Sequence, residues 1–352
     1  MKKILLILLL IPISVNALSA KSAIVMDIDS NRILYNKDIN RVQCVASISK
    51  IMTAIIAIES KKLEDEVIIG EYINKAYGSS IYIKENEKIK LIDLVYGLML
   101  RSGNDAALAI AYHVSGSIDE FVKLMNEKAK DLKMNSSTFN NSSGLDEDKG
   151  NYSTAYDMAL LMSYAMKNDI FKKITSTKNY KVKTNLNFYD WTNKNKLLKN
   201  YKYATGGKTG YTEVAKRTLV TTATKDNTNI VIVTLNDPND FKNHEELFKN
   251  SFEKYKSYKI LYKGKFEILD EKFYKNRDFF LINNFTYPLT EEEKNNIVLK
   301  IKLKELYNYK NKQEVGEINV FVNNKKIHTE KVYISLKKIK IDVFKKILEL
   351  FK

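Results

Sequence analysis

Apolar residues recur every three or four positions through much of the first two-thirds of the chain, the spacing of helices with one buried face. The stretches with this pattern are residues 47–59, 91–114, 120–133, 154–168 and 241–261. The second is interrupted at Ser102-Gly103-Asn104, and glycine is a poor helix residue. We therefore expect two helices joined by a loop there.

Other stretches predict strands. Residues 23–36 predict two short strands around a turn at residues 29–31, and residues 219–224 and 229–237 predict a hairpin with a buried strand. After about residue 262 the apolar residues alternate with charged ones, as in IVLKIKLK at 297–304. EINVFV and KVYIS flank a turn at Asn323-Asn324. Such strands have one solvated face, so a small all-β domain is expected.

The first twenty residues have the pattern of a secretory signal peptide. Lys2 and Lys3 precede the apolar run ILLILLLIPISV, and small residues suited to cleavage stand at 15–17 and 18–20. An uncleaved membrane anchor is the alternative, which the shortness of the apolar run disfavours. The pattern predicts an exported protein at the outer face of the cytoplasmic membrane or in the cell wall.

The last sixteen residues predict an amphipathic helix. One half of its surface is apolar and the other charged, and Lys340 alone breaks the pattern; the apolar positions are Ile341, Val343, Phe344, Ile347, Leu348, Leu350 and Phe351. Such a helix is typical of a membrane-surface anchor, and packing on the β domain is the alternative. The predicted organisation is therefore a signal peptide (1–20), a catalytic domain (21–261), a β-rich domain (262–336) and the terminal helix (337–352).

Charge and cysteine content narrow the function. The net charge of +16 favours anionic surroundings, although lysine is also a common solvating residue. Nucleic acid does not suit an exported protein, so wall polymers or lipid headgroups fit better. Cys44 is the only cysteine, which excludes an internal disulfide, and we interpret it as a small buried residue. One cysteine and three scattered histidines do not favour a zinc site, and no cofactor is expected.

The first candidate chemistry is CVASISKIMTAI, residues 44–55. Residues three apart share a helix face, so Ser47 and Lys50 point the same way among apolar neighbours. A desolvated lysine is a candidate base, and a serine beside it a candidate nucleophile. Ser-x-x-Lys alone is weak evidence, because it recurs at 251–254 and 335–338.

Two further motifs strengthen this interpretation. Ser102-Gly103-Asn104 and Lys208-Thr209-Gly210 follow in the order typical of serine enzymes that act on penicillin or D-alanyl peptides. Taken singly, Ser102 and Asn104 suit helix caps and Lys208 a solvated turn. Longer stretches match as well: LRSGNDAALAIA, SSGLDEDKGNYSTAYDMALL, NKNKLL and GGKTGYT. With these, nearly the whole mature chain resembles the D-alanyl-D-alanine carboxypeptidases, the low-molecular-weight penicillin-binding proteins.

The resemblance implies a β-lactamase-like α/β (α+β) catalytic domain, with an antiparallel sheet flanked by helices and a helical subdomain bearing Ser102. It implies that Ser47 attacks the peptide, that Lys50 takes its proton, assisted by the charge of Lys208, and that Ser102 relays a proton to the leaving group. The implied substrate-binding residues are Asn104, Lys208, Thr209, Gly210 and Tyr211. The implied partners are the peptidoglycan stem peptide and β-lactam antibiotics.

The chain departs from the family pattern at three places. Val45 stands where proline is usual, Ser49 where threonine is usual, and Lys216-Arg217 where glycine is usual after the third motif. The first two changes are conservative. The third affects the rim of the site.

Three other functions were weighed. A β-lactamase would need a glutamate to activate water, and Glu147 with Asn151 has a suitable spacing, but this stretch matches the carboxypeptidases. A non-catalytic wall-binding protein would not need all three motifs. A Ser-His-Asp hydrolase is disfavoured because the histidines lie away from every motif. Asp105 and Asp157 are interpreted as structural residues.

Overall fold

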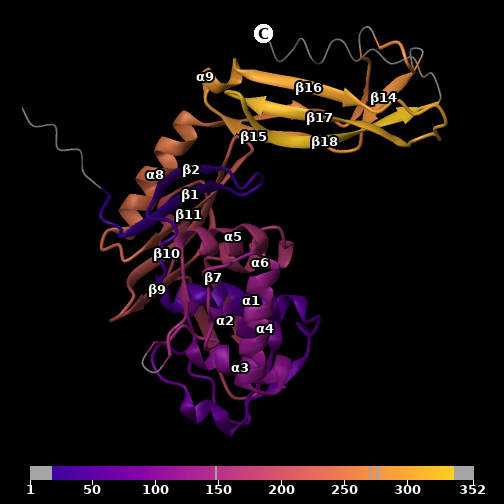
Figure 1. Ribbon diagram of the computed structural model, residues 1–352. Coiled ribbons are helices and arrows are strands. Elements are labelled where there is room, and N and C mark those ends of the chain that lie inside the picture. Colours follow the sequence, from indigo (N-terminus) through magenta and orange to yellow (C-terminus); the bar gives the residue numbers. More distant parts are fainter. Residues whose placement is uncertain (1–17, 147–148, 269–270, 275–276, 337–352) are drawn as a thin grey trace, which may run out of the picture.

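The computed structural model describes residues 18–146, 149–268, 271–274 and 277–336 (Figure 1). A helical region and an antiparallel sheet form the first part, and an elongated, sheet-rich part follows. Antiparallel sheets combined with helices confirm the predicted α+β class. The predicted signal peptide up to residue 17 and the terminal helix from residue 337 lie outside the described residues. No helix in the described part of the chain is long and apolar enough to span a membrane.

The central sheet has the strand order β2-β1-β11-β10-β9 and is antiparallel throughout. Its strands are β1 (Ser22–Asp27), β2 (Ile33–Lys37), β9 (Ala204–Thr212), β10 (Lys216–Lys225) and β11 (Thr228–Leu235). Alternate residues of β11 enter different cores: Val231 and Val233 pack with the helical region, whereas Ile230 and Ile232 pack with Phe248. Burial on both faces explains why this strand is almost continuously apolar.

Helices cover both faces of this sheet. On one side lies α8 (Asp240–Lys254), and on the other lie α5 (Ala155–Ala165) and the rest of the helical region (Figure 1). The latter contains η1 (Ala46–Ser49), α1 (Lys50–Glu59), η2 (Glu71–Lys75), α2 (Leu91–Arg101), α3 (Asn104–Ser115), α4 (Ile118–Asp131) and α6 (Asp169–Ser176). The short α7 (Leu197–Asn200) packs with α8 through Leu197. The interruption predicted at residues 102–104 is confirmed.

Three two-stranded sheets complete this part. They pair β3 (Gln43–Cys44) with β6 (Tyr152–Ser153), β4 (Glu66–Ile68) with β5 (Lys88–Lys90), and β7 (Asn179–Lys183) with β8 (Phe188–Thr192). The last pair was not predicted. Trp191 of β8 is buried beside the tyrosines of the same hairpin and of α2, so this hairpin closes the side of the helical region.

The C-terminal part is a five-stranded antiparallel sheet with an added strand pair. Its strands are β13 (Gly264–Phe266), β14 (Asp278–Leu281), β16 (Ile297–Leu303), β17 (Glu314–Val322) and β18 (Lys325–Ser335), and α9 (Glu291–Lys294) precedes β16. The strand character predicted for this region is confirmed. Its core includes Ile318, Val320 and Val332, which come from alternate positions of adjacent strands.

The predicted helix over residues 241–261 is wrong over its last seven residues. α8 ends at Lys254, and Lys256–Leu261 forms β12, which pairs with β15 (Phe285–Leu289). Ile260 and Leu261 are buried in the C-terminal core. Pairing with a strand some thirty residues later decides the conformation here, and local periodicity does not reveal such a partner. The predicted domain limits stay a prediction.

Arg32, just before β2, joins the two parts. Its guanidinium group donates hydrogen bonds of 2.5 Å to the Pro288 carbonyl and of 2.5 Å to the Glu293 carboxylate. It also lies 5.2 Å from the ring centre of Tyr255 and 5.0 Å from that of Tyr287. One side chain of the first part therefore makes four polar or cation–π contacts near the base of the C-terminal sheet.

Candidate active site

Ser47 lies in η1, the tight turn that leads into α1. Ala46, before it, has a φ of +51°, and the loop at Gly144 presses on the same turn. Gly144 has a φ of +82°, and a Cβ there would lie 2.1 Å from the Ala46 carbonyl oxygen. Only glycine fits so close to the Ala46 carbonyl. The Ser-Ser-Gly-Leu-Asp stretch therefore packs against the turn that holds Ser47 and supports it.

Lys50 lies one helical turn after Ser47 and is completely buried. Its Nζ lies 2.9 Å from the Ser47 Oγ and 2.7 Å from the Asn104 Oδ1, and it also contacts the Ser143 carbonyl. The structure therefore brings together a hydroxyl from the first motif, its amine and the amide of the second motif, although 57 residues separate Ser47 from Asn104.

Burial, the largest cause, and the charge of Lys194 together lower the pKa of Lys50 to about 7, while Asp105 opposes the shift. The resemblance implied Lys208 as the assisting cation. The charges of Lys50 and Lys208 do interact, and Lys194 is a further cation that lowers the pKa of Lys50. A neutral amine has two protons and one lone pair. It can donate to Asn104 and Ser143 and accept the proton of Ser47, which matches its three contacts.

The second motif occupies the α2–α3 junction. Ser102 ends α2 with a φ of +66° and is buried, and its hydroxyl makes no hydrogen bond to any other described residue. Asn104 begins α3, and its Nδ2 donates to the Tyr77 carbonyl at 2.7 Å, which orients its oxygen toward Lys50. Asp105 accepts from the backbone N–H groups of Ile81 and Tyr82, in agreement with the structural role expected for it.

The third motif lies on β9, at the edge of the central sheet. Lys208 is buried, and its Nζ donates to the Thr209 carbonyl at 2.7 Å. Its pKa lies well below the usual range because of burial and the charges of Lys50 and Lys194. The charge of Lys50 thus contributes to the low pKa of Lys208. The two lysines therefore interact, and the third motif belongs to the same site as the first two.

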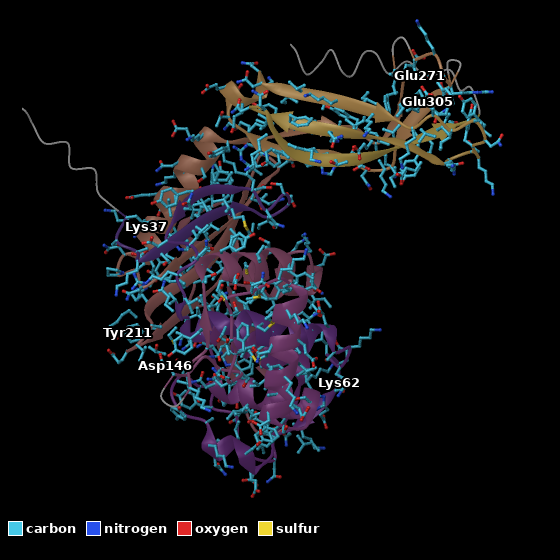
Figure 2. All side chains as sticks on the ribbon, viewed as in Figure 1. Lys37, Lys62, Asp146, Tyr211, Glu271 and Glu305 are labelled. Carbon is cyan, nitrogen blue, oxygen red and sulfur yellow. The ribbon has the colours of Figure 1, made fainter. Side chains whose placement is uncertain are left out.

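Gly210 and Tyr211 continue this strand past Ser47. A Cβ on Gly210 would lie 3.1 Å from the Ser47 backbone nitrogen and 2.4 Å from the Thr218 Oγ1. β9 therefore runs directly against the serine turn. Tyr211 is 55% exposed and donates to Glu213 at 2.6 Å, so its side chain lies at the rim. Figure 2 shows Tyr211 and Asp146 at this end of the strand, where the adjacent Thr212 donates to Asp146.

The departure at the β9–β10 hairpin affects only the rim. Lys216 has a φ of +57°, a conformation that favours glycine, and its ammonium lies 3.2 Å from Glu213. Arg217 donates to Asp240 at 2.8 Å and 3.1 Å, so it binds α8. The hairpin therefore has a lysine in a strained conformation where the family pattern has glycine.

Two participants were missed by sequence reasoning. One is the Ser143 carbonyl, which no side-chain pattern reveals. The other is Lys194, an exposed residue whose Nζ lies 3.4 Å from the Ser79 Oγ. Among the described residues, no carboxylate lies within ion-pair distance of it. Lys194 stands in the stretch NKNKLL, and this position was the only signal that could have drawn attention to it.

Other candidate residues have structural partners. Cys44 is buried and donates to Asp146, and burial raises the pKa of its thiol to about 11, which fits the interpretation as a buried small residue. The side chain of Asn151 binds the backbone of Asn140 and Asn141. Asp157 accepts from Ser136 and Ser137. Glu147 lies outside the described residues, which contain no cluster suited to a metal ion.

Comparison with known proteins agrees with this geometry. The family model for D-alanyl-D-alanine carboxypeptidase matches residues 12–239. The chain belongs to this family of serine enzymes. Its sequence is 33% identical over 300 residues to D-alanyl-D-alanine carboxypeptidase DacF of Bacillus subtilis, covering 81% of this chain and 77% of that protein.

Solved structures give the same result. Penicillin-binding protein 5 of Haemophilus influenzae aligns with a TM-score of 0.78 and 25% identity, covering 91% of this chain and 97% of that one. A D-alanyl-D-alanine carboxypeptidase of Mycobacterium tuberculosis aligns with a TM-score of 0.64 and 31% identity, covering 67% and 92%. The first alignment extends through the C-terminal sheet, and the second covers two-thirds of the chain.

Proposed function

We propose that this protein is a serine-type D-alanyl-D-alanine carboxypeptidase that removes the terminal D-alanine from peptidoglycan stem peptides. The observation that carries the proposal is the position of the buried Lys50 amine, 2.9 Å from the Ser47 hydroxyl. A base with a pKa of about 7 is half neutral at neutral pH, so it can accept the serine proton.

In the acylation step, Ser47 Oγ bonds to the carbonyl carbon between the two D-alanines as its proton passes to Lys50. The backbone N–H groups of Ser47 and Tyr211 stabilise the oxyanion, and the close approach of Gly210 to the Ser47 nitrogen supports this assignment. Each such donor contributes ~3 kcal/mol. The carbon–nitrogen bond then breaks, and Ser102, whose hydroxyl has no hydrogen-bond partner among the described residues, passes its proton to the departing amine. The proton held by Lys50 replaces it on Ser102, so Lys50 is neutral again before water attacks.

In the second step, water adds to the acyl carbon and the bond to Ser47 Oγ breaks, which regenerates the serine and releases the shortened peptide. Lys50 takes a proton from the water and returns it to the serine. Asn104 holds Lys50 in position and offers its amide to the peptide. A β-lactam ring supplies a carbonyl of similar shape, so it acylates the same oxygen.

The substrate carboxylate would be bound by Lys208 and Thr209, and the peptide backbone would extend the sheet along Gly210 and Tyr211. Lys208 has a pKa well below its usual range in the unliganded site because it is buried and because the charges of Lys50 and Lys194 lie nearby. A bound carboxylate would stabilise its charged form, so binding is expected to favour proton uptake by this lysine. This pairing explains a requirement for a free C-terminal carboxylate.

The same proposal places the protein outside the cytoplasm. The signal-like sequence at residues 1–20 and the amphipathic pattern at 337–352 support export and attachment to the membrane surface. Family membership supports a substrate in the cell wall. A β-lactamase is not proposed, because the Asn151 side chain is already engaged by the backbone of its own loop.

Release of D-alanine from a synthetic stem pentapeptide tests the proposal. We expect release by the wild type, none by Ser47→Ala, and little from the same peptide with its terminal carboxylate amidated. Absence of release by the wild type would favour a non-catalytic wall-binding protein. Rapid turnover of penicillin without a lasting adduct would favour a β-lactamase.

A further inference from the structure

A cavity of about 670 Å³ opens at the end of the central sheet where β9 begins and β10 ends. Its walls come from the end of α7, the last turn of α8 and the first residue of β12. The active site lies at the other end of β9, where Gly210 approaches Ser47. The cavity is therefore separate from the catalytic residues.

Aromatic rings form much of the cavity wall. Tyr201, Tyr203 and Phe252 line it, and the ring centres of Tyr201 and Tyr203 lie 5.7 Å apart. Tyr201 is 8% exposed, and its hydroxyl makes no hydrogen bond within the described part of the chain. The only hydroxyl there that is both unpaired and fully buried is that of Ser163, so the Tyr201 hydroxyl keeps access to solvent.

Four lysines surround these rings: Lys202, Lys225, Lys249 and Lys256. Lys202 and Lys225 lie over the same ring, with their Nζ atoms 4.7 Å and 5.4 Å from the centre of Tyr203. Neither has a carboxylate within ion-pair distance among the described residues. Two ammonium groups therefore lie over one ring without a carboxylate partner in the described part of the chain. This leaves a local excess of positive charge.

The other two lysines have protein partners that do not remove this excess. Lys249 pairs with Glu245 at 2.6 Å, and Lys256 donates to the Phe252 carbonyl at 2.7 Å. Glu253 is the one acidic residue of the cavity wall. With Glu245 counted beside Glu253, the four lysines leave an excess of two positive charges around an apolar floor with an unpaired hydroxyl.

We propose that this cavity binds a phosphate group of an anionic polyol- or sugar-phosphate polymer. Lys202 and Lys225 pair with the phosphate, the Tyr201 hydroxyl donates to one of its oxygens, and the aromatic rings pack on the C–H groups of the adjoining polyol or sugar. A recessed cavity admits a single chain. A lipid bilayer is flat and contacts protruding groups, so the shape favours the polymer.

The consequence is a second contact with an anionic matrix that does not involve the catalytic groups. Binding in the cavity would hold the protein on the polymer. The Ser47 site would stay open, because the two sites lie at opposite ends of β9. Binding to the polymer is therefore expected to weaken with added salt and to leave hydrolysis of a small soluble peptide unchanged.

The test measures binding of the full mature chain to poly(glycerol phosphate), with neutral dextran as the reference polymer. We expect Lys202→Gln combined with Lys225→Gln to weaken binding roughly tenfold and to reduce its salt dependence. Tyr201→Phe should weaken it roughly threefold, because the hydroxyl is lost while the ring remains. The matched control is Lys259→Gln with Lys300→Gln, two exposed lysines that also lie over aromatic rings.

Polymer binding that the cavity variant loses and the control variant retains supports the proposal. Equal losses in both variants would show a general charge effect and overturn it, as would a wild type that does not bind the polymer. Two further experiments test inorganic phosphate as a competitor of the polymer and phosphatidylglycerol vesicles as an alternative ligand. Phosphate competition with the polymer supports the site, whereas cavity-dependent binding to the vesicles alone overturns the choice of a polymer. Ser47→Ala should bind the polymer normally, which separates this result from the catalytic proposal.

Discussion

The Lys50 amine lies 2.9 Å from the Ser47 hydroxyl and has no access to solvent. Burial makes the charged form of this lysine costly, and the nearby charge of Lys194 adds to that cost. The same environment that destabilises the ammonium ion makes the amine a base at neutral pH. The buried environment therefore both holds the Lys50 amine beside Ser47 and sets its pKa.

This arrangement predicts a pH dependence. The base must be neutral, so acylation should rise with pH through about 7, where Lys50 loses its proton. Lys194→Gln removes a positive charge, which raises the pKa of Lys50. The rise in acylation rate then moves to higher pH. A shift of about half a unit would roughly halve the neutral fraction at pH 7.

The measurement is the acylation rate by a fluorescent penicillin between pH 5.5 and 9. Lys172→Gln is the control, because that lysine is exposed on α6 and has an acidic partner in Asp169. An unchanged profile in Lys194→Gln, or a shift of equal size in the control, would contradict the role assigned to Lys194.

The buried histidine of α8 predicts a second pH effect, on stability. His244 lies between the hydroxyls of Thr221 and Thr234, and burial lowers its pKa to about 3. Above the ordinary pKa of histidine both states are neutral. As the pH falls from about 6.5 toward 3, only the unfolded chain takes up this proton, so stability is lost with acid.

We expect His244 to lower the free energy of unfolding by about 2 kcal/mol between pH 7 and pH 5. Urea unfolding at the two pH values measures this, with His244→Gln as the comparison. The variant should lose less stability on acidification than the wild type does. An equal loss in the two proteins would show that this histidine does not titrate as described.

Arg32 predicts how the two parts of the molecule are coupled. Arg32→Met keeps an apolar stem but removes the bonds to Pro288 and Glu293. The cost is about 1–3 kcal/mol, because Glu293 is left without its partner in a partly buried position. Calorimetry should show a lower first transition, or two transitions in place of one, while D-alanine release is retained. A single transition at the wild-type temperature would contradict a coupling role.

The strained hairpin predicts a stabilising change. Lys216 has a φ of +57°, where a side chain costs about 1 kcal/mol and glycine costs nothing. Its exposed pair with Glu213 contributes little. Lys216→Gly should therefore raise the melting temperature by a few degrees, roughly 2–4 °C. Lys183→Gly, in a strand position without positive φ, should lower it, and a drop in both variants would contradict the strain at Lys216.

Much of this structure could be predicted from the sequence where local pattern decides it. The helices after Ser47 and around Gly103 follow from apolar spacing, and the strands around Asn323 from alternation. The conformation of Lys256–Leu261 could not, because its partner β15 lies outside any local window. The hairpin at Trp191 was missed for a similar reason, since its stability depends on packing against Tyr96 through Tyr180.

The site shows the same division. Motif order identified Ser47, Lys50, Ser102, Asn104 and the Lys208 strand as candidates, because those side chains have recognisable chemistry. Lys194 and the Ser143 carbonyl were not predicted. The effect of Lys194 on the pKa of Lys50, and the contact of the Ser143 carbonyl with Lys50, exist only in the folded chain. The sequence therefore pointed to Lys208, whose charge interacts with that of Lys50, but not to Lys194.

The most direct test of the central claim is the position of the covalent adduct formed with benzylpenicillin. Intact-protein mass spectrometry with peptide mapping should find one penicilloyl group on Ser47 in the wild type. Ser47→Ala should form no adduct although it remains folded by circular dichroism. An adduct that persists in Ser47→Ala, or that maps to another residue in the wild type, would contradict the account.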